Sequence, residues 1–493
     1  MTWWLWLILG IVVLFTVVAI HDVTQKKHAI LRNFPIIGHL RYLIEKVGPE
    51  LRQYIVADND EELPFSRDQR RFVYASAKQQ NAYFGFGTDN DLSKPGYVLF
   101  RHAAFPHDPP PEEESDQLAM RKVLGERHGR AKAFQPESAV YISAMSFGSL
   151  SAQAVEAINR GSKIAGSLHN TGEGGISDHH RHGGPLIFQL GTGYFGARNP
   201  DGSFSMDKLL ESMDGADVQA IELKLSQGAK PGLGGVLPGN KVTPEIAEAR
   251  GVEVGVTVLS PSRHRAFSDV GALISFCEEI GSVTGVPVGI KSAVGIKSFW
   301  HELAEQMDDT GKGPDFISID GGEGGTGAAP LPFSDHMALP FRQGFSEVYR
   351  AFAERGLHEQ LVFLGAGKLG LPTEAMVAMA MGVDGIGVAR EAMLAIGCVQ
   401  AQKCHDGHCP TGVATQNRWL TRGLDPTDKS VRLANYVAEL RHELVRLSNA
   451  MGAEHPSLVD PSQVEIRLDT DSISPVRDLF NYDPHWPGGA PSR

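Results

Sequence analysis

The sequence contains little cysteine and no excess of basic charge. Four cysteines among 493 residues are too few for a disulfide framework in a chain of this length. Lys and Arg number 46 against 58 Asp and Glu, which gives a formal net charge of −12. This balance argues against nucleic acid as the main partner, because phosphates are neutralised by clustered Lys and Arg. A GxGxxG fingerprint after a first strand is also missing, which disfavours an open dinucleotide-binding sheet.

Only one segment is long and apolar enough to span a membrane. Residues 3–20 (WWLWLILGIVVLFTVVAI) carry no charge and reach about 27 Å as a helix, close to the thickness of a bilayer core. Tryptophans lie at its start, and Lys26, Lys27 and Arg32 follow its end. The positive-inside rule then predicts a single-pass anchor in the cytoplasmic membrane, with the rest of the chain in the cytoplasm. A cleaved signal peptide is the alternative, although the basic region that normally begins one is lacking.

The composition changes along the chain and predicts four parts. Residues 1–22 form the transmembrane anchor, and 23–115 form a mostly helical, polar connector or N-terminal extension. That connector ends in the proline- and acid-rich string HDPPPEEES. Residues 116–455 form the main domain, and 456–493 form a C-terminal tail that wraps around it or is loose.

The main domain repeats one pattern, a short apolar run followed by a glycine-rich or polar loop and then a helical segment. Strands that are apolar throughout and alternate with helices indicate a parallel sheet covered on both faces. Seven runs and a probable eighth strand near 185–190 predict an α/β fold, a (β/α)8 TIM barrel, whose chemistry lies at the carboxyl ends of the strands. An open doubly wound sheet is the alternative. The seven runs are VYISAMSFG, VQAIELKLSQG, VEVGVTVLSP, VPVGIKSAVG, DFISIDGGEGG, LVFLGAGKLG and DGIGVAR.

Three of the four cysteines fall within twelve residues. Cys398, Cys404 and Cys409 have C-x5-C-x4-C spacing, with a proline directly after the last one. Thiolates this close can surround one iron–sulfur cluster, either a three-iron cluster or a four-iron cluster with an outside ligand. A zinc ion with His405 or His408 as fourth ligand is the rival interpretation, and three unrelated buried cysteines are the third.

Glycine-rich loops follow three of the later strands. They are residues 320–330 (DGGEGGTGAAP), 365–370 (GAGKLG) and 387–390 (GVAR). Loops after the last strands of a barrel commonly bind phosphate through backbone N–H groups, so three of them favour flavin mononucleotide or a similar ligand over simple turns. Lys291 at the end of another strand would place a cation near the ring of such a ligand.

Two further loops carry charged and amide groups among glycines. NTGEGG (170–175) contains Glu173, and the segment 221–235 contains Gln227 and Lys230. These side chains could bind a polar substrate above a cofactor. Solvated loop charges are the alternative interpretation.

These motifs together resemble a known family. SAMSFGSLS, NTGEGG, SQGAKPG, DGGEGGTGAAP and CPTGVATQ, in this order, resemble the FMN-binding synthase domain of glutamate synthases. The connector strings RNFPIIGHLRYLIEKVGPELRQY and EELPFSRDQRR resemble the shorter, membrane-anchored branch called FMN-binding glutamate synthase family proteins. The resemblance implies a (β/α)8 barrel with FMN at its mouth and a 3Fe-4S cluster on Cys398, Cys404 and Cys409.

The same resemblance assigns the remaining site residues. Glu173, Gln227, Lys230 and Arg250 would line the site of a 2-oxo acid. Arg250 would pair with a substrate carboxylate and Lys230 would bind the reacting oxygen or imine. Glu173 would carry a proton if burial raises its pKa. The residues expected to contact FMN are Ser143, Ala144, Met145, Ser146, Gln189, Lys291, Asp320, Gly321, Gly322, Gly365, Ala366, Gly367 and the segment from Gly387 to Arg390.

The implied activity is that of an oxidoreductase acting on CH–NH2 donors. It would reduce the 2-imino acid formed from 2-oxoglutarate and ammonia to L-glutamate. An external donor, namely a ferredoxin, a partner reductase or a membrane quinone pool, would supply the electrons, because the sequence shows no NAD(P) fingerprint. We also expect ammonia to arrive free or from a separate glutaminase, since the chain shows neither an amidotransferase domain nor its N-terminal catalytic cysteine.

One departure from the family leaves the substrate open. Val236 follows the GLGG string where the large enzymes carry a glutamine near 2-oxoglutarate. A related flavoenzyme acting on another amine or 2-oxo acid, such as an N-methylglutamate synthase-like enzyme, is therefore the second hypothesis. A non-catalytic, membrane-tethered redox sensor is the third.

Overall fold

The computed structural model describes residues 3–80, 85, 87–111 and 114–487. The chain divides into two compact units, Met1–Arg70 and Arg71–Arg493. Helix α4 (Arg67–Ala77) runs across the boundary between them.

The first unit is a set of consecutive helices. They are α1 (Trp3–Thr24), α2 (Ala29–Asn33), α3 (Gly38–Leu51) and a π-helical turn η1 (Arg52–Val56). Helix α1 has a mean hydropathy of 2.6 over its most apolar stretch, and no residue of that stretch is buried. At its end, the buried carboxylate of Asp22 accepts hydrogen bonds from Ile36 N and His39 Nε2, both at 2.9 Å. Length and composition allow α1 to cross a membrane, but a signal sequence has the same properties.

The second unit is built around a closed barrel of eight parallel strands. Their order around the barrel is β2, β3, β4, β5, β8, β9, β10 and β11, and β11 pairs with β2 to close it. The predicted (β/α)8 barrel is therefore confirmed. The strands are β2 (Val140–Ile142), β3 (His169–Asn170), β4 (Leu186–Leu190), β5 (Val218–Lys224), β8 (Val288–Ser292), β9 (Phe316–Asp320), β10 (Val362–Ala366) and β11 (Gly385–Val388).

One predicted strand was wrong and one barrel strand was missed. The expected eighth strand near 185–190 is β4. The run VEVGVTVLSP lies outside the barrel, where β7 (Val258–Leu259) pairs antiparallel with β6 (Val236–Leu237). Its apolar side chains Val254, Val256 and Leu259 are about half exposed or more. The barrel strand that takes its place among the eight is β3, which the sequence analysis did not predict. It is two residues long and has buried polar side chains.

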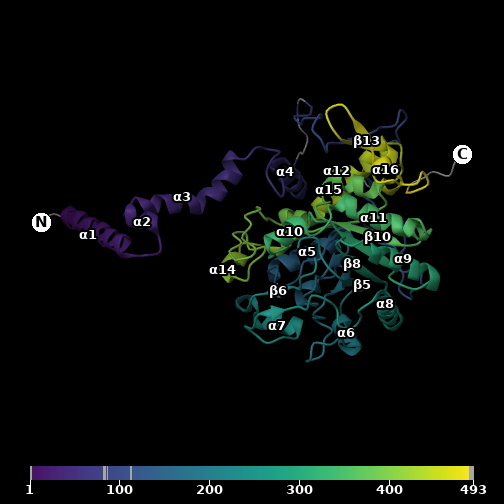
Figure 1. Cartoon of the computed structure of the whole chain (residues 1–493), viewed down its shortest axis with the longest axis horizontal. Helices are drawn as coiled ribbons and strands as arrows, with labels where there is room; N and C mark the ends of the chain where they lie inside the picture. The colour runs from purple at the N-terminus through teal and green to yellow at the C-terminus, as the bar shows by residue number, and fades with distance from the viewer. Residues whose placement is uncertain (1–2, 81–84, 86, 112–113, 488–493) are drawn as a thin grey trace. The chain divides into compact units, whose positions relative to one another are not determined.

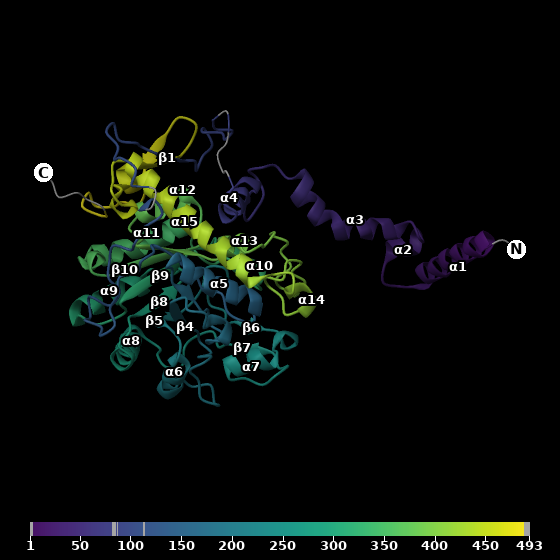
Figure 2. The ribbon, with the colours of Figure 1, turned by 180° about the vertical axis from the view of Figure 1, so that it is seen from behind.

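Helices cover the outside of the barrel, and Figure 1 shows α6, α8 and α9 around strands β5 and β8. Helix α15 packs along α5, and Figure 2 shows the two side by side. A Cβ on Gly161 of α5 would lie 2.8 Å from Ser430 O, so this close contact requires glycine. The helices are α5 (Ala152–Ala165), α6 (Met206–Met213), α7 (Pro244–Arg250), α8 (Val270–Thr284), α9 (Ser298–Thr310), α10 (Leu331–His336), α11 (Phe341–Ala353), α12 (Pro372–Ala380), α13 (Arg390–Ala395), α14 (Arg418–Thr421), α15 (Pro426–Ala450) and α16 (Val476–Leu479).

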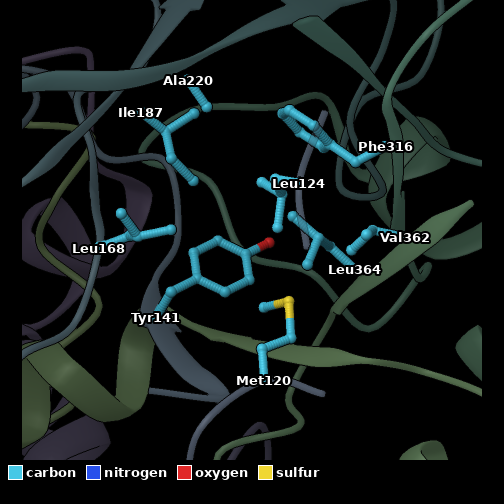
Figure 3. Close-up of a cluster of buried hydrophobic side chains, with 9 residues drawn as sticks. All are labelled: Met120, Leu124, Tyr141, Leu168, Ile187, Ala220, Phe316, Val362 and Leu364. Carbon is cyan, nitrogen blue, oxygen red and sulfur yellow. The ribbon is translucent and has the colours of Figure 1, made fainter. Parts of the chain in front are cut away.

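An apolar cluster fills the barrel interior (Figure 3). Met120 and Leu124, from the segment before β2, are fully buried in it beside the ring of Tyr141. The Tyr141 hydroxyl lies 3.3 Å from Ser318 Oγ, and burial raises the pKa of this tyrosine. This part of the interior is therefore packed and apolar, and the Tyr141 hydroxyl within it is protonated.

A small antiparallel sheet joins distant parts of the chain. Strand β12 (Val464–Arg467) lies between β1 (Val98–Phe100) and β13 (Ile473–Pro475). Residues from the predicted connector and from the predicted tail thus pair with each other within the second unit.

Candidate active site

The parallel strands bring several predicted site residues to one end of the barrel. All eight strands run in the same direction, so the residues at and after their carboxyl ends gather at one mouth. Glu173 follows β3, Gln227 and Lys230 follow β5, and Lys291 is the next-to-last residue of β8. Glu173, Gln227 and Lys230 were predicted from motifs that follow their strands, and Lys291 was predicted from its place at the end of a strand.

An ion pair at this mouth involves a lysine that the sequence analysis did not name. Lys224 ends β5, and its Nζ donates to Glu173 Oε1 at 2.8 Å and to Gln227 Oε1 at 2.6 Å. Lys224 and Lys230 are each 8% exposed. Burial lowers the pKa of Lys230, the charge of Lys224 lowers it further, and Glu173 opposes the shift. The site therefore holds two adjacent buried ammonium groups and one carboxylate.

The condition attached to Glu173 as a proton carrier does not hold. Burial raises the pKa of this carboxyl, but the charge and hydrogen bond of Lys224 and the charges of Lys230 and Arg250 lower it. The net direction is downward, so Glu173 is an ionised carboxylate that balances the lysines. Lys230, with its lowered pKa, is the better candidate for moving a proton.

Arg250 is a buried guanidinium beside this pair. It ends helix α7, is 5% exposed and lies over the ring of Phe195. Its Nη2 donates to Phe147 O at 3.0 Å and to Ser146 Oγ at 3.3 Å, while its Nε has no hydrogen-bond partner. Burial lowers its pKa to about 10. Within the described residues no carboxylate oxygen lies within 4.0 Å of the guanidinium nitrogens. A buried guanidinium without such a partner is suited to bind an anion.

Lys291 is a fourth buried cationic side chain at this mouth, and it contacts a neutral hydroxyl group. Its side chain is on β8, and its Nζ donates to Ser143 Oγ, 3.2 Å away, just after β2. These two strands lie on opposite sides of the barrel, so the bond crosses the mouth. Ser143 N in turn donates to Val388 O at 2.8 Å, which fixes the start of its loop against β11.

A buried carboxylate lies one layer below this bond. Glu222 of β5 is fully buried and accepts from Gln189 Nε2 at 2.7 Å and from Asn170 Nδ2 at 2.8 Å. Both bonds end on its Oε1, and its Oε2 has no partner. Gln189, predicted as a cofactor contact, is therefore oriented by Glu222, and its carbonyl oxygen remains available as an acceptor.

The glycine-rich loops are held close together. Gly321 N donates to Ala366 O at 2.9 Å, which joins the loops after β9 and β10. Asp320 accepts from Gly228 N at 2.9 Å through its Oδ2. A Cβ on Gly367, which has φ of +121°, would lie 2.9 Å from Gly321 N, so no side chain fits there. The loops therefore offer backbone where a phosphate would approach.

Two of the predicted cofactor glycines lie inside strands. A Cβ on Gly365 of β10 would lie 2.8 Å from the ring of Phe341. A Cβ on Gly387 of β11 would lie 2.7 Å from the Tyr141 hydroxyl. Their missing side chains leave room for aromatic rings of the core. The other predicted cofactor residues, Ala144, Met145, Gly322 and Arg390, lie after the ends of β2, β9 and β11.

Replacing Gly367 by Ala should weaken the barrel and lower the content of the flavin that the sequence predicts. The new methyl group meets Gly321 at a backbone conformation that non-glycine residues rarely adopt, which costs about 1–3 kcal/mol. The measurements are the flavin content and the melting temperature of the purified protein. Gly295→Ala is the matched control, because nothing lies within 4 Å of its Cβ. Equal flavin content in the two variants would contradict this reading of the loop.

The three clustered cysteines lie in one partly buried loop after α13. Gln400 N donates to Cys398 Sγ at 3.4 Å, and Lys241 donates to the carbonyl of Cys404 at 3.0 Å. Burial, together with the nearby Cys404 and Cys409, raises the pKa of the Cys398 thiol to about 12. A raised pKa disfavours the thiolate form, and a bound metal cation would offset this cost because metal ligands must be deprotonated.

The geometry is less suited to zinc. Among the described residues, the three sulfur atoms do not all lie within 4.8 Å of one another. Thiolates on one tetrahedral zinc ion are roughly 3.8 Å apart, since each Zn–S bond is about 2.3 Å. His405 and His408, the candidate fourth ligands, are both exposed. A cluster uses a different iron for each thiolate and spaces them more widely.

Comparisons with known proteins identify the family. A profile of the conserved region in glutamate synthase matches residues 111–454. The glutamate synthase large subunit-like protein YerD of Bacillus subtilis is 38% identical, and the alignment covers 95% of this chain and 96% of YerD. The chain belongs to the glutamate synthase family. It is accordingly a glutamate synthase-like oxidoreductase of the class acting on CH–NH2 groups.

More distant relatives match only part of their length. The archaeal-type glutamate synthase [NADPH] of Thermotoga sp. (strain RQ2) is 34% identical over 69% of this chain, and the chain spans 64% of that protein. Among solved structures, a mutant flavocytochrome b2 with pyruvate bound aligns over 94% of both chains, with 13% identity and a TM-score of 0.44. A similarity this weak supports no inference about chemistry.

Several residues of this family member's site escaped the sequence analysis. Lys224 and Glu222 are two apart in an apolar strand, so both point into the barrel, and that spacing was an available signal. His264 and Tyr194 had no such signal. His264 contacts Lys224 O at 2.9 Å and the Tyr194 hydroxyl at 3.0 Å through its two ring nitrogens.

His264 should make the protein less stable in acid. Burial lowers its pKa from 6.5 to about 4, so the unfolded chain binds a proton that the folded chain excludes between these values. Its contribution is complete above pH 6.5 and falls by up to about 3 kcal/mol as the pH drops to 4. Melting temperatures from pH 7 to 4 test this. In His264→Gln the decline should be shallower, and an identical decline would contradict the assignment.

Proposed function

We propose that this chain makes L-glutamate by reducing the 2-imino acid that forms from 2-oxoglutarate and ammonia. The observation that carries the proposal is Arg250, a buried guanidinium without a carboxylate partner among the described residues, beside Glu173 and Lys230. A substrate carboxylate would supply the missing anion. Membership of the glutamate synthase family supports 2-oxoglutarate as the substrate that carries this carboxylate.

The residues at the mouth fit FMN. Lys291, with Ser143, would lie against the electron-rich edge of the ring, and Gln189 would offer its amide oxygen. The backbone of Gly367 and Gly321 would face the phosphate. FMN, when bound, supplies hydride chemistry, and the protein contributes placement and charge.

The chain's own residues then have separate tasks. Arg250 binds one substrate carboxylate through its fork of N–H groups and sets the orientation of the 2-carbon. Lys230 Nζ hydrogen-bonds the group at that carbon and moves a proton to or from it, which its lowered pKa favours. Glu173 is held in place by Lys224. Its negative charge offsets the repulsion between the ammonium groups of Lys224 and Lys230 and their repulsion of a protonated imine.

Electrons are proposed to reach this site from outside the chain. Cys398, Cys404 and Cys409 would hold a 3Fe-4S cluster, which supplies one-electron transfer when bound. The donor is then a ferredoxin, a partner reductase or a quinone pool. The name of the Thermotoga relative includes NADPH, and a reductase that oxidises NADPH and passes its electrons to this chain agrees with that name. Ammonia comes free or from a separate glutaminase.

Helix α1 is proposed to hold the protein at the cytoplasmic membrane, as a single pass with the barrel in the cytoplasm. Full-length protein should remain in the membrane pellet after carbonate washing, and a chain lacking residues 1–24 should be soluble with its flavin retained, because α1 belongs to the first unit. Mass spectrometry of the membrane-bound form should find residues 3–20 intact. Loss of this segment in the mature protein would show a cleaved signal sequence instead.

A different amine or 2-oxo acid is the second candidate, and Val236 favours it. This side chain is 53% exposed on β6, next to Gly235, whose Cβ would lie 2.8 Å from Glu173 Oε1. An apolar group there offers no hydrogen bond to a substrate. It could instead accept an N-alkyl group, as an N-methylglutamate synthase-like reaction requires.

A substrate screen under anaerobic conditions separates these proposals. The holoprotein is reduced, and the return of flavin absorbance is followed after 2-oxo acids are added with ammonia or with methylamine. Glutamate formation requires that 2-oxoglutarate with ammonia reoxidise the flavin fastest. Faster reoxidation with methylamine would favour the second candidate, and no reoxidation by any pair would favour a redox sensor.

A further inference from the structure

A cluster of three metal-ligating side chains lies outside the proposed active site. Glu156 of α5 and His179 and His182 of the segment between β3 and β4 each offer one ligand atom, and these atoms all lie within 4.8 Å of one another. None of the three has a role in the proposed reaction. Two imidazoles and one carboxylate are a donor set that borderline divalent metals prefer, zinc in particular.

The loop that carries the two histidines is fixed to the helix that carries Glu156. Asn159 is three residues after Glu156 and so lies on the same side of α5. Its Oδ1 accepts from His182 N at 2.9 Å and from Gly184 N at 3.1 Å, and its Nδ2 donates to Gly184 O. The two segments are thus joined before any ion binds.

A second set of bonds fixes the turn at His179. The buried ring of His180 accepts from Ser177 N at 3.1 Å and lies 2.9 Å from Ser177 Oγ, which closes a one-turn helix over residues 178–180. The neighbouring ring of His179 contacts Glu245 and packs against the buried ring of Phe147. The ligands are therefore preorganised, and little ordering cost opposes binding.

The charges and exposure suit an ion that enters from solvent. The side chains of His179, His182 and Glu156 are 19%, 28% and 22% exposed. Glu156 pairs with Arg160 at 2.6 Å, and His179 pairs with Glu245. Both partners are exposed enough to turn away, and Glu245 is an available fourth ligand.

We propose that Glu156, His179 and His182 form a zinc-binding site that clamps the 178–184 loop to α5. Through Glu245, the clamp also reaches α7, the helix that ends with Arg250. The site is separate from the clustered cysteines and uses nitrogen and oxygen ligands only.

The test uses tag-free holoprotein loaded with FMN and iron and dialysed against micromolar Zn²⁺. We expect one zinc per chain by mass spectrometry, with X-ray absorption showing nitrogen and oxygen neighbours at about 2.0–2.1 Å and no sulfur at about 2.3 Å. Zinc should also slow hydrogen exchange of residues 177–184. His179→Ala/His182→Ala should lose the ion, and His301→Ala, an exposed histidine on α9, should keep it.

Three results would overturn the proposal. They are no zinc uptake, a sulfur shell around the zinc, or equal uptake by the double variant. Bound zinc without slower exchange would refute the clamp. Glu156→Gln provides a variant of the same shape if the double variant folds poorly, and it should bind zinc at least tenfold more weakly while retaining its flavin.

Discussion

Replacing Arg250 by Ala is expected to raise the KM for 2-oxoglutarate about 10- to 150-fold, since a hydrogen-bonded charged contact contributes about 1.5–3 kcal/mol. The guanidinium is 5% exposed and has no carboxylate within 4.0 Å among the described residues, so the substrate anion would be its partner. The measurement is steady-state turnover with 2-oxoglutarate and ammonia varied in turn. The KM for ammonia should change little, because in the proposed binding mode Arg250 contacts the carboxylate and Lys230 contacts the nitrogen.

Arg250→Lys is the matched control for this effect. It keeps the positive charge but loses the planar fork, so its KM should lie between those of the native protein and Arg250→Ala. Flavin content and melting temperature should be compared for both variants, because the side chain also donates to Phe147 O. A KM for 2-oxoglutarate unchanged in Arg250→Ala, with flavin retained, would contradict the proposed binding mode.

Replacing Cys409 by Ser is expected to eliminate the iron and to lower donor-dependent turnover at least 100-fold. Removing a residue that only orients a metal ligand lowers activity by about 10- to 100-fold, and removing a ligand itself should cost at least as much. Cys409 is 6% exposed within the loop that also carries Cys398 and Cys404. The measurements are iron and sulfide content, the electron paramagnetic resonance signal of the oxidised protein, and turnover with a reduced ferredoxin.

Two controls separate the cluster from the fold. Cys277→Ala changes the fourth cysteine, which is fully buried in α8 and is distant in sequence from the other three. This variant should keep its iron. In Cys409→Ser, light-driven reduction of the flavin should still permit one turnover of the oxo acid, because that route would bypass the proposed cluster. Full iron content in Cys409→Ser would show that this cysteine is not a ligand.

The barrel could be predicted because its strands are apolar and are followed by glycine-rich loops. Strand β3 could not, because it consists of His169 and Asn170, two buried polar residues with no apolar run. The run at 252–261 has the composition of a buried strand, yet Val254 and Leu259 are exposed. Composition alone does not show which apolar run finds a partner surface, so these two errors offset each other in the count of eight.

The sequence predicted where the residues of the candidate site lie better than it predicted their ionisation states. The motifs identified Glu173 and Lys230, but the ionisation of Glu173 depends on Lys224, 51 residues away in sequence. Burial and nearby cations shift the pKa of a carboxyl in opposite directions, and only the packed structure shows which effect is larger. Lys224 itself could have been found, since it and Glu222 interrupt an apolar strand at a spacing of two.

The central claim is that reduced flavin at the barrel mouth passes its electrons to an imino acid made from 2-oxoglutarate and ammonia. The most direct test is a single anaerobic turnover of photoreduced holoprotein with 2-oxoglutarate and ¹⁵N-ammonia, with the products measured by mass spectrometry. We predict one ¹⁵N-labelled L-glutamate for each flavin reoxidised, and no reoxidation when either substrate is omitted. Reoxidation without labelled glutamate, or no reoxidation by the complete mixture, would contradict the claim.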